Sequence, residues 1–426
     1  MSDNTTELDF GTTAQKTTDA EKLPVVLLAL DQGKYDMTRS LDELRALADA
    51  NGMDAVAEVV QKRSTPEAAT LLGEGKVAEA RLVCQNVNAA AIFDGELTGS
   101  QIRNLSAALQ VEVLDRTMLI LEIFRARATT NEGKLQTELA TLRYQLPRLQ
   151  GLGESLSRQG GGGGGGARRG AGETKLELDR RHLHHRIEHL EGRLKELEKR
   201  RGETRRARQK NNVPVVALVG YTNVGKSSLL NALCGEQIFE ADMLFATLDP
   251  TARKLVLPSG LQIILVDTVG FVSRLPHHLV EAFKSTLEEA AFADVIIKVA
   301  DAGDAQAAEQ LAVTDEVLGS LDCEGIPQLV VYNKCDVANA VAFDPDILLT
   351  SAKTGYGLDA LLAKIDEVLN HRVRTIEVVL PYDKLALADI LRSRGSVAEE
   401  EYREEGVFYR ATVKIDDLHR FEAFLI

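Results

Sequence analysis

The stretch Val213–Leu233, VPVVALVGYTNVGKSSLLNAL, decides the fold of the central part of this chain. It starts as an apolar run rich in β-branched residues, continues through Gly220-x4-Gly225-Lys226-Ser227, and ends in an apolar helical pattern. A strand, a glycine loop and a helix in this order predict a P-loop, because the loop N–H groups and the helix N-terminus attract phosphate. Lys226 is expected to reach the β- and γ-phosphates, and the Ser227 hydroxyl is expected to bind Mg²⁺.

Two motifs after the P-loop are expected to complete the phosphate and metal site. Asp267-Thr268-Val269-Gly270 follows the apolar run IILVD, which places the Asp267 carboxylate near the water shell of the metal and the Gly270 N–H near the γ-phosphate. The segment 245–251 reads FATLDPT. Within it Thr247 is the candidate for the second Mg²⁺ hydroxyl, and Thr251 is its competitor.

Two later motifs predict recognition of guanine. Asn333-Lys334-Cys335-Asp336 follows the run QLVVY, and the Asp336 carboxylate can accept both N–H groups of guanine, a donor pair that adenine lacks. The Lys334 stem can cover the base plane, and Asn333 can join this loop to the P-loop. Ser351-Ala352-Lys353 is expected to supply a backbone N–H to the guanine oxygen. Five motifs in this order predict a GTP- and GDP-binding site.

The complete set of expected nucleotide-binding residues is Gly220, Tyr221, Thr222, Asn223, Val224, Gly225, Lys226, Ser227, Phe245, Ala246, Thr247, Leu248, Asp249, Asp267, Thr268, Val269, Gly270, Asn333, Lys334, Asp336, Ser351, Ala352 and Lys353. Ser227 and Thr247 are the expected metal ligands, and Lys226, Thr247 and Gly270 are the residues assigned to catalysis.

Two positions depart from the Ras-type pattern. Phe271 stands where Ras-type GTPases have the glutamine that orients the attacking water, so slow intrinsic hydrolysis is expected. Either a polar side chain from 249–253 or 273–274 replaces the glutamine, or a partner completes the site. Asn223 resembles the asparagine of potassium-activated GTPases, which suggests K⁺ as a second cofactor; its alternative role is to bond the loop backbone.

The rest of the chain predicts further domains of α/β type. Residues 1–22 are polar and expected to be disordered, and residues 23–130 alternate short apolar runs with helical patterns, which predicts a small parallel α/β subdomain. A Ras-like P-loop G domain is expected over 211–372. A small α+β domain over 373–426 is expected to contain a strand, a helix, two strands and a helix. No bilayer-length apolar run or signal peptide is present, so we expect a cytoplasmic protein without a membrane partner.

A helical hairpin is expected over 131–210, with a glycine-rich tip at 151–174. The first arm has a leucine seam that should end near Pro147, and the second repeats the same spacing of four and three residues, as in a coiled coil. The seam residues are Leu135, Leu139, Leu142, Leu146 and Leu149, followed by Leu183, Ile187, Leu190, Leu194 and Leu197. Although the chain has a net charge of −14, residues 168–210 hold fifteen Lys or Arg against eight Asp or Glu. This stripe is either a solvated helix face or a surface for nucleic-acid phosphates.

Several stretches resemble the HflX family of ribosome-associated GTPases, in the Obg-HflX superfamily. They are LLGEGKVAE at 71–79, VLDRTMLILEIFRARATTNEGKLQTELA at 113–140, RRGAGETKLELDRR at 168–181, and GYTNVGKS with LFATLDPT. The resemblance runs from about residue 23 to the C-terminus. Ala171, where the family usually has proline, and the long glycine run depart from it.

The resemblance implies the same four-part fold and a ribosomal function. Members bind the large ribosomal subunit, place the hairpin tip near the peptidyl-transferase centre, and split stalled ribosomes in a GTP-dependent way, with hydrolysis stimulated by the ribosome. We therefore expect Arg168, Arg169, Gly170 and Gly172 to contact rRNA, and a monomer is expected. The alternatives are a GTP-gated RNA-binding factor in large-subunit assembly and a regulatory switch with a protein partner. The glycines at 160–166 are either part of the contact or a flexible spacer.

Overall fold

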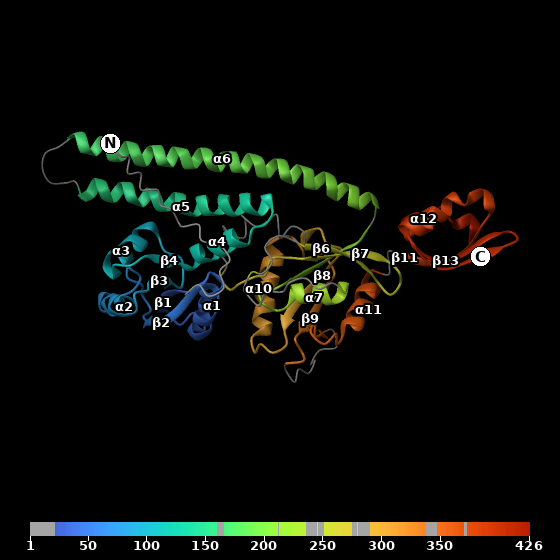
Figure 1. The fold of residues 1–426 in the computed structure, drawn as a ribbon, viewed down its shortest axis with the longest axis horizontal. Helices are drawn as coiled ribbons and strands as arrows, with labels where there is room; N and C mark the ends of the chain where they lie inside the picture. Colours follow the sequence, from blue (N-terminus) through green and yellow to red (C-terminus); the bar gives the residue numbers. More distant parts are fainter. Residues whose placement is uncertain are drawn as a thin grey trace. The chain divides into compact units, whose positions relative to one another are not determined.

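The computed structural model describes residues 22–159, 166–211, 213–235, 245, 251–274, 279, 290–337, 347–369 and 373–426. The segment predicted to be disordered, 1–22, lies outside these residues except for Lys22. The chain forms two compact units, 1–126 with 141–183, and 127–140 with 184–426 (Figure 1). Among the described residues, no helix combines the length and apolar character needed to cross a bilayer.

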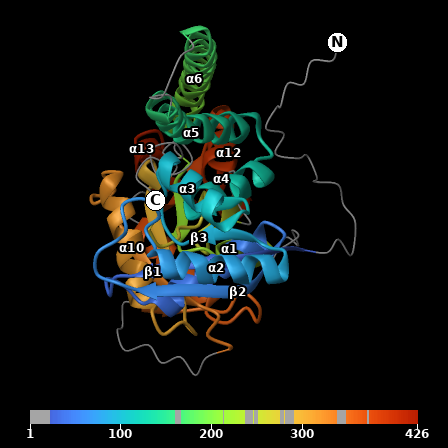
Figure 2. The same cartoon turned by 90° about the vertical axis from the view of Figure 1, so that its left-hand side faces the viewer.

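The first unit contains the predicted parallel α/β subdomain (Figure 2). Its four parallel strands are ordered β2-β1-β3-β4, and helices α2 and α3 pack against one face. β1 is buried over most of its length, as the continuous apolar run predicts for a parallel sheet. The elements are β1 Leu23–Asp31, α1 Met37–Ala50, β2 Met53–Lys62, α2 Glu74–Val87, β3 Ala90–Phe93, α3 Gly99–Leu109, β4 Val113–Asp115 and α4 Arg116–Arg127.

Two long helices, α5 (Asn131–Gln159) and α6 (Gly166–Asn211), form the hairpin. Ion pairs from Glu138 to Arg186 (2.6 Å) and from Glu132 to Arg201 (2.9 Å) show that they run antiparallel. Over 181–200, the buried or half-buried positions of α6 are the five predicted seam residues, Leu183, Ile187, Leu190, Leu194 and Leu197. The coiled-coil interpretation of the leucine spacing is thus confirmed for this stretch.

The glycine-rich tip predicted at 151–174 is mostly helical, which corrects its bounds. α5 continues through Pro147 to Gln159, and α6 begins at Gly166. The backbone of Arg168, Arg169, Gly170 and Gly172 therefore lies in the first turns of α6 rather than in a loop. Proline removes only one helical hydrogen bond, and the Leu, Glu, Gln, Arg and Ala residues on both sides favour helix enough to offset the glycines. Residues 160–165 lie outside the described part.

The G domain has a six-stranded sheet ordered β10-β9-β8-β5-β7-β6, in which only β6 is antiparallel to its neighbour. Its elements are β5 Val215–Gly220, α7 Lys226–Cys234, β6 Thr251–Val256, β7 Gln262–Asp267, β8 Val295–Asp301, α10 Ala307–Ser320, β9 Gln328–Asn333, β10 Ile347–Leu349 and α11 Leu358–Leu369. The parallel strands end at one edge of the sheet, the usual ligand position in such folds. Three predicted motifs follow β5, β7 and β9 at that edge.

The C-terminal domain is a small α+β fold, as predicted. Its antiparallel sheet is ordered β11-β13-β12, and its core includes Val378, Leu380, Leu391, Ala411 and Phe421. The elements are β11 Val373–Leu380, the 3₁₀ turn η2 Tyr382–Lys384, α12 Ala386–Arg394, β12 Ser396–Arg403, β13 Gly406–Lys414, α13 Ile415–Leu418 and η3 Glu422–Phe424.

Candidate nucleotide-binding site

The glycines of the P-loop permit an unusually close approach of backbone segments. Gly220, at the end of β5, has φ +148°, and a Cβ there would lie 2.2 Å from the Val299 carbonyl oxygen. Gly225 has φ +88°, and its Cβ would lie 2.4 Å from Asn333 Nδ2. A side chain at either position would displace a neighbouring strand or loop, so both must be glycine.

Lys226 begins α7 and is buried, with 7% of its surface exposed. Its Nζ donates to the carbonyls of Gly220 (3.1 Å) and Tyr221 (2.8 Å) inside the loop. Burial lowers the pKa of Lys226 from 10.5 to about 8, and the negative charge of Asp267 opposes that shift. A phosphate at this loop would supply the negative charge that the buried ammonium lacks.

Ser227 and Asp267 form the metal side of the site. Ser227 Oγ donates to Asp267 Oδ2 at 2.6 Å, and Asp267, the last residue of β7, is buried. A hydroxyl and a carboxylate are hard oxygen ligands of the kind that Mg²⁺ prefers, so the residues present fit this ion. Thr247 lies outside the described residues, and its competitor Thr251 pairs with Asp267 in the ladder between β6 and β7.

The segment after Asp267 packs directly on the P-loop. A Cβ on Gly270 would lie 2.8 Å from the Thr222 side chain and 3.0 Å from Lys226 Nζ. The Thr222 N–H donates to the Phe271 carbonyl (2.7 Å), and the Phe271 N–H donates to the Gly220 carbonyl (3.1 Å). Because the Phe271 ring is also buried, this residue cannot orient an attacking water.

The guanine side is joined to the P-loop by two side chains. Asn333 Nδ2 donates to the Val224 carbonyl (3.0 Å), and its Oδ1 accepts from the Ala352 N–H (3.0 Å). Lys334, at φ +63°, donates through Nζ to the Asn223 carbonyl (2.6 Å) and pairs with the Asp301 carboxylate (2.8 Å). These contacts bring three separate motifs together at the carboxyl edge of the sheet.

Asp336 is held in its ionised form. Its carboxylate accepts from Ser351 Oγ at 2.7 Å, and this hydrogen bond is the main reason why the pKa of Asp336 lies below its usual value. An ionised carboxylate accepts both guanine N–H groups. Ser351-Ala352-Lys353 is expected to supply a backbone N–H to the guanine oxygen. The Ala352 N–H is donated to Asn333 here, and Lys353 supplies the next backbone N–H of the loop.

The structure thus brings together residues of the P-loop, of 267–270, of 333–336 and of 351–353, whereas Ala246, Thr247, Leu248 and Asp249 lie outside the described residues. Phe245 is described and buried. Thr268 Oγ1 donates to the Leu218 carbonyl (2.7 Å), which secures the segment around Val269.

Sequence reasoning missed one supporting residue of this site, Asp301, and one contact, that of Tyr221 with Ser273. Asp301, the last residue of β8, holds Lys334, and its position at a strand end beside the guanine motif was the available signal. The Tyr221 hydroxyl accepts from the Ser273 N–H, which joins the P-loop to the segment after Gly270. No spacing rule predicts that second contact.

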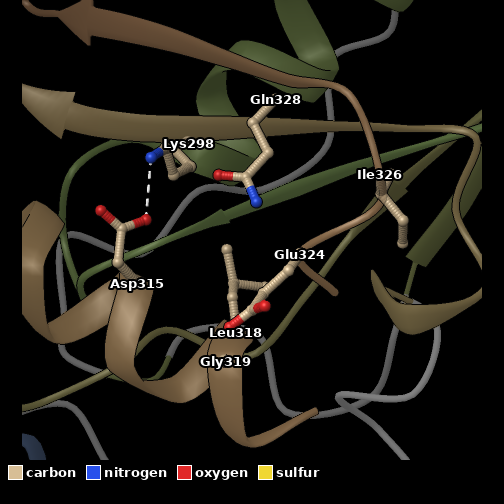
Figure 3. A pocket seen from close by; sticks show the side chains of 7 residues that line it. All are labelled: Lys298, Asp315, Leu318, Gly319, Glu324, Ile326 and Gln328. Carbon is tan, nitrogen blue, oxygen red and sulfur yellow. Dashed lines mark hydrogen bonds and ion pairs between the residues drawn. The ribbon is translucent and has the colours of Figure 1, made fainter. Parts of the chain in front are cut away.

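A separate pocket of about 460 Å³ lies in the G domain, between β8, α10 and the start of β9 (Figure 3). Lys298 and Asp315 pair across it at 2.8 Å. No residue of the five motifs lines it, so it is distinct from the nucleotide site.

Comparison with known proteins agrees with this geometry. Family models match in chain order: "GTP-binding GTPase N-terminal" over 38–125, "GTP-binding GTPase Middle Region" over 127–208, "50S ribosome-binding GTPase" over 215–334, and "HflX C-terminal domain" over 336–418. The GTPase HflX of Caldanaerobacter subterraneus subsp. tengcongensis is 46% identical over 409 residues, covering 95% of this chain and 94% of that protein. The chain belongs to the HflX family of GTPases.

Other HflX relatives extend the similarity. The GTPase HflX of Escherichia coli K12 is 39% identical over 377 residues, which cover 86% of this chain and 87% of that protein. Among solved structures, SsGBP in complex with GDP has a TM-score of 0.47 at 25% identity, covering 82% of this chain and 99% of that one. Membership of the HflX family means that the P-loop described above serves GTP binding and hydrolysis.

Proposed function

We propose that this HflX-family GTPase binds the large ribosomal subunit through its helical hairpin and uses GTP to split stalled ribosomes, with hydrolysis stimulated by the ribosome. The protein works in the cytoplasm as a monomer, with Mg²⁺ as its metal. The match of residues 215–334 to the model described as "50S ribosome-binding GTPase" supports the ribosomal partner.

The observation that carries the proposal is the composition of α6. In an acidic chain, the described part of this helix buries one narrow seam, and its exposed surface carries more basic than acidic side chains. The exposed basic residues are Arg180, Arg181, Arg186, Arg193, Lys195, Lys199 and Arg200. Phosphate contacts give most of the affinity of such surfaces for RNA. The helix also includes Arg168, Arg169, Gly170 and Gly172, the residues proposed to reach rRNA at the tip.

The nucleotide site then controls this surface. Lys226 and the loop N–H groups bind the phosphates, and Ser227 with Thr247 would hold Mg²⁺, which neutralises phosphate charge when bound. Gly270 lies against Lys226 and would meet the γ-phosphate through its N–H. In the GTP-bound state the segments 245–251 and 267–271 would be ordered and the hairpin would be held on rRNA, and hydrolysis would release it.

The missing glutamine explains why a partner is needed. Phe271 is buried and bonded through its backbone, so the protein alone positions the attacking water poorly. A ribosomal contact that orders the nearby segments would supply the missing group. Asn223 has φ +60° and an exposed side chain in the P-loop, where it would help bind K⁺ beside the phosphates. Equal turnover in K⁺ and Na⁺ at matched ionic strength would remove this part of the proposal.

The second candidate function is a GTP-gated RNA-binding factor in assembly of the large subunit. The same basic helix favours it, because charge alone does not distinguish mature from immature rRNA. Sedimentation of intact ribosomes after incubation with the protein and GTP separates the two functions. A splitting factor shifts ribosomes toward subunits in GTP but not in GDP, whereas an assembly factor leaves them intact.

A charge variant of α6 tests the route of binding. Arg181→Gln, Arg193→Gln and Lys199→Gln together remove three exposed cations, and they should weaken subunit binding and reduce its salt dependence. Glu196→Gln, which removes an exposed negative charge from the same helix, is the matched control and should bind at least as tightly as the wild type. Unchanged binding by the triple variant would exclude α6 as the RNA surface.

A further inference from the structure

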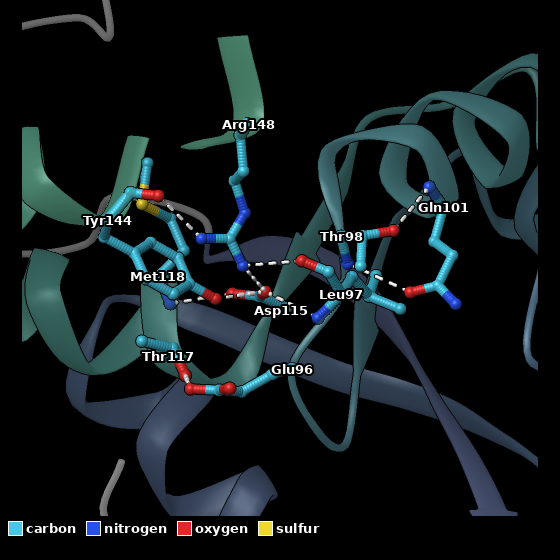
Figure 4. Close-up of polar contacts among 9 residues, drawn as sticks. All are labelled: Glu96, Leu97, Thr98, Gln101, Asp115, Thr117, Met118, Tyr144 and Arg148. Atoms are coloured by element: carbon cyan, nitrogen blue, oxygen red, sulfur yellow. Dashed lines mark hydrogen bonds and ion pairs between the residues drawn. The ribbon is translucent and has the colours of Figure 1, made fainter. Parts of the chain in front are cut away.

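Asp115 lies at the carboxyl end of β4, where the N-terminal sheet meets α5 of the hairpin (Figure 4). Its side chain is fully buried. Its two oxygens accept from the Leu97 N–H (3.0 Å) and the Met118 N–H (2.9 Å), which belong to the subdomain itself. They also accept from the Tyr144 hydroxyl and from Arg148 Nη2 (2.9 Å), which belong to α5.

Arg148 strengthens the same connection from the hairpin side. Besides Asp115, its guanidinium donates to the Leu97 carbonyl (2.6 Å) and to the Tyr144 carbonyl (2.8 Å), and it stacks 3.2 Å from the centre of the Tyr144 ring. Arg148 therefore joins the loop before α3 to α5.

The backbones of α3 and α5 also approach each other closely beside Asp115. A Cβ on Gly99, the first residue of α3, would lie 2.5 Å from the Arg148 carbonyl oxygen. Thr98, just before it, caps α3 with Gln101 in a reciprocal pair of hydrogen bonds, so the surface that faces α5 is itself rigid. Residues 141–183 consequently belong to the same compact unit as residues 1–126.

We propose that Asp115 is a positioning residue that fixes the direction of the outer half of the hairpin, 141–183, relative to the N-terminal sheet. A single carboxylate receives donors from β4–α4, from the loop before α3 and from α5, so none of these can turn without breaking a buried, charge-assisted bond. Resting on the proposed ribosomal function, the consequence is that the subdomain and the hairpin tip reach the large subunit as one body. The entropic cost of orienting the hairpin at the moment of binding is then reduced.

The variant Tyr144→Phe with Arg148→Gln tests this inference, because it removes the bonds from α5 and leaves the two backbone bonds of Asp115. Double electron–electron resonance measures the distance between nitroxide amino acids placed at the exposed positions Asn86 (α2) and His182 (α6). This distance changes when the hairpin changes direction relative to the N-terminal sheet. We expect one narrow distance distribution in the wild type and a broad one in the variant. The single variant Arg148→Lys keeps the positive charge beside Asp115, so its distance distribution should be much narrower than that of the double variant.

Function supplies the second readout. The variant should keep the wild-type rate of intrinsic GTP turnover, but should need about tenfold more large subunit to reach half of its stimulated rate. Lys134→Ala, at an exposed lysine of the same helix, is the matched control and should behave as wild type. An unchanged distance distribution would overturn the inference. If the double variant fails to fold, Tyr144→Phe alone decides it, since loss of one hydroxyl should still broaden the distribution.

The proposed ribosomal function and the proposed role of Asp115 can be refuted independently of each other. A wild-type protein that shows no response to ribosomes would contradict the proposed function, while the distance measurement would still confirm or overturn the role of Asp115.

Discussion

Nucleotide affinity should fall as the pH rises through the pKa of Lys226. In the protein alone, burial places this pKa at about 8, and phosphate oxygens would raise it again because they stabilise the ammonium. The pKa is then higher in the complex than in the free protein, so affinity is full below pH 8 and is lost above it. With about 90% of Lys226 charged at pH 7 and about 24% at pH 8.5, the Kd for GDP should rise about fourfold, or ~0.8 kcal/mol.

Titration calorimetry with GDP at pH 7 and pH 8.5, in excess Mg²⁺, measures this change directly. Repeating each titration in buffers of different ionisation enthalpy shows that the protein takes up a proton on binding at the higher pH. The Lys226→Gln variant is the control: it should bind more weakly at both pH values, without the fourfold change. The ionisation of the guanine base affects GDP binding equally in the two proteins. An equal pH dependence of the Kd in wild type and variant would therefore refute the assignment to Lys226.

Three further changes probe other parts of the fold. Asn333→Ala removes a buried side chain that joins two loops, and it should lower the free energy of unfolding by about 2 kcal/mol in urea titrations. Tyr221→Phe removes only the hydroxyl that accepts from the Ser273 N–H, so single-turnover measurements should show slower hydrolysis at an unchanged GTP affinity. Leu190→Ala in the hairpin seam should cost about 2–4 kcal/mol by the same urea assay, whereas the exposed Arg193→Ala should cost less than about 0.5 kcal/mol.

The parts of the fold with strong local patterns could be predicted from the sequence. β1 is a continuous buried apolar run, and over 181–200 the leucine spacing of α6 gives the buried and half-buried positions residue by residue. The motif order places the P-loop, Asp267 and Asn333 after their strands, because parallel strands align their carboxyl ends.

The prediction failed where local signals compete. At the hairpin tip, glycine and proline indicate a break, but the helix formers around Pro147 outweigh one lost hydrogen bond, so α5 extends to Gln159. The contacts of Asp115 with Tyr144 and Arg148 join residues about thirty positions apart, and no periodicity encodes such pairs. Tertiary packing alone brings them together.

GTP turnover with and without large ribosomal subunits, in K⁺ buffer at low salt, tests the central claim most directly. A buried Phe271 in place of a water-orienting residue predicts slow turnover by the protein alone and stimulation by orders of magnitude when subunits are added. The small ribosomal subunit at the same concentration is the control and should have little effect. Turnover that is fast without ribosomes, or that large subunits leave unchanged, would contradict the account.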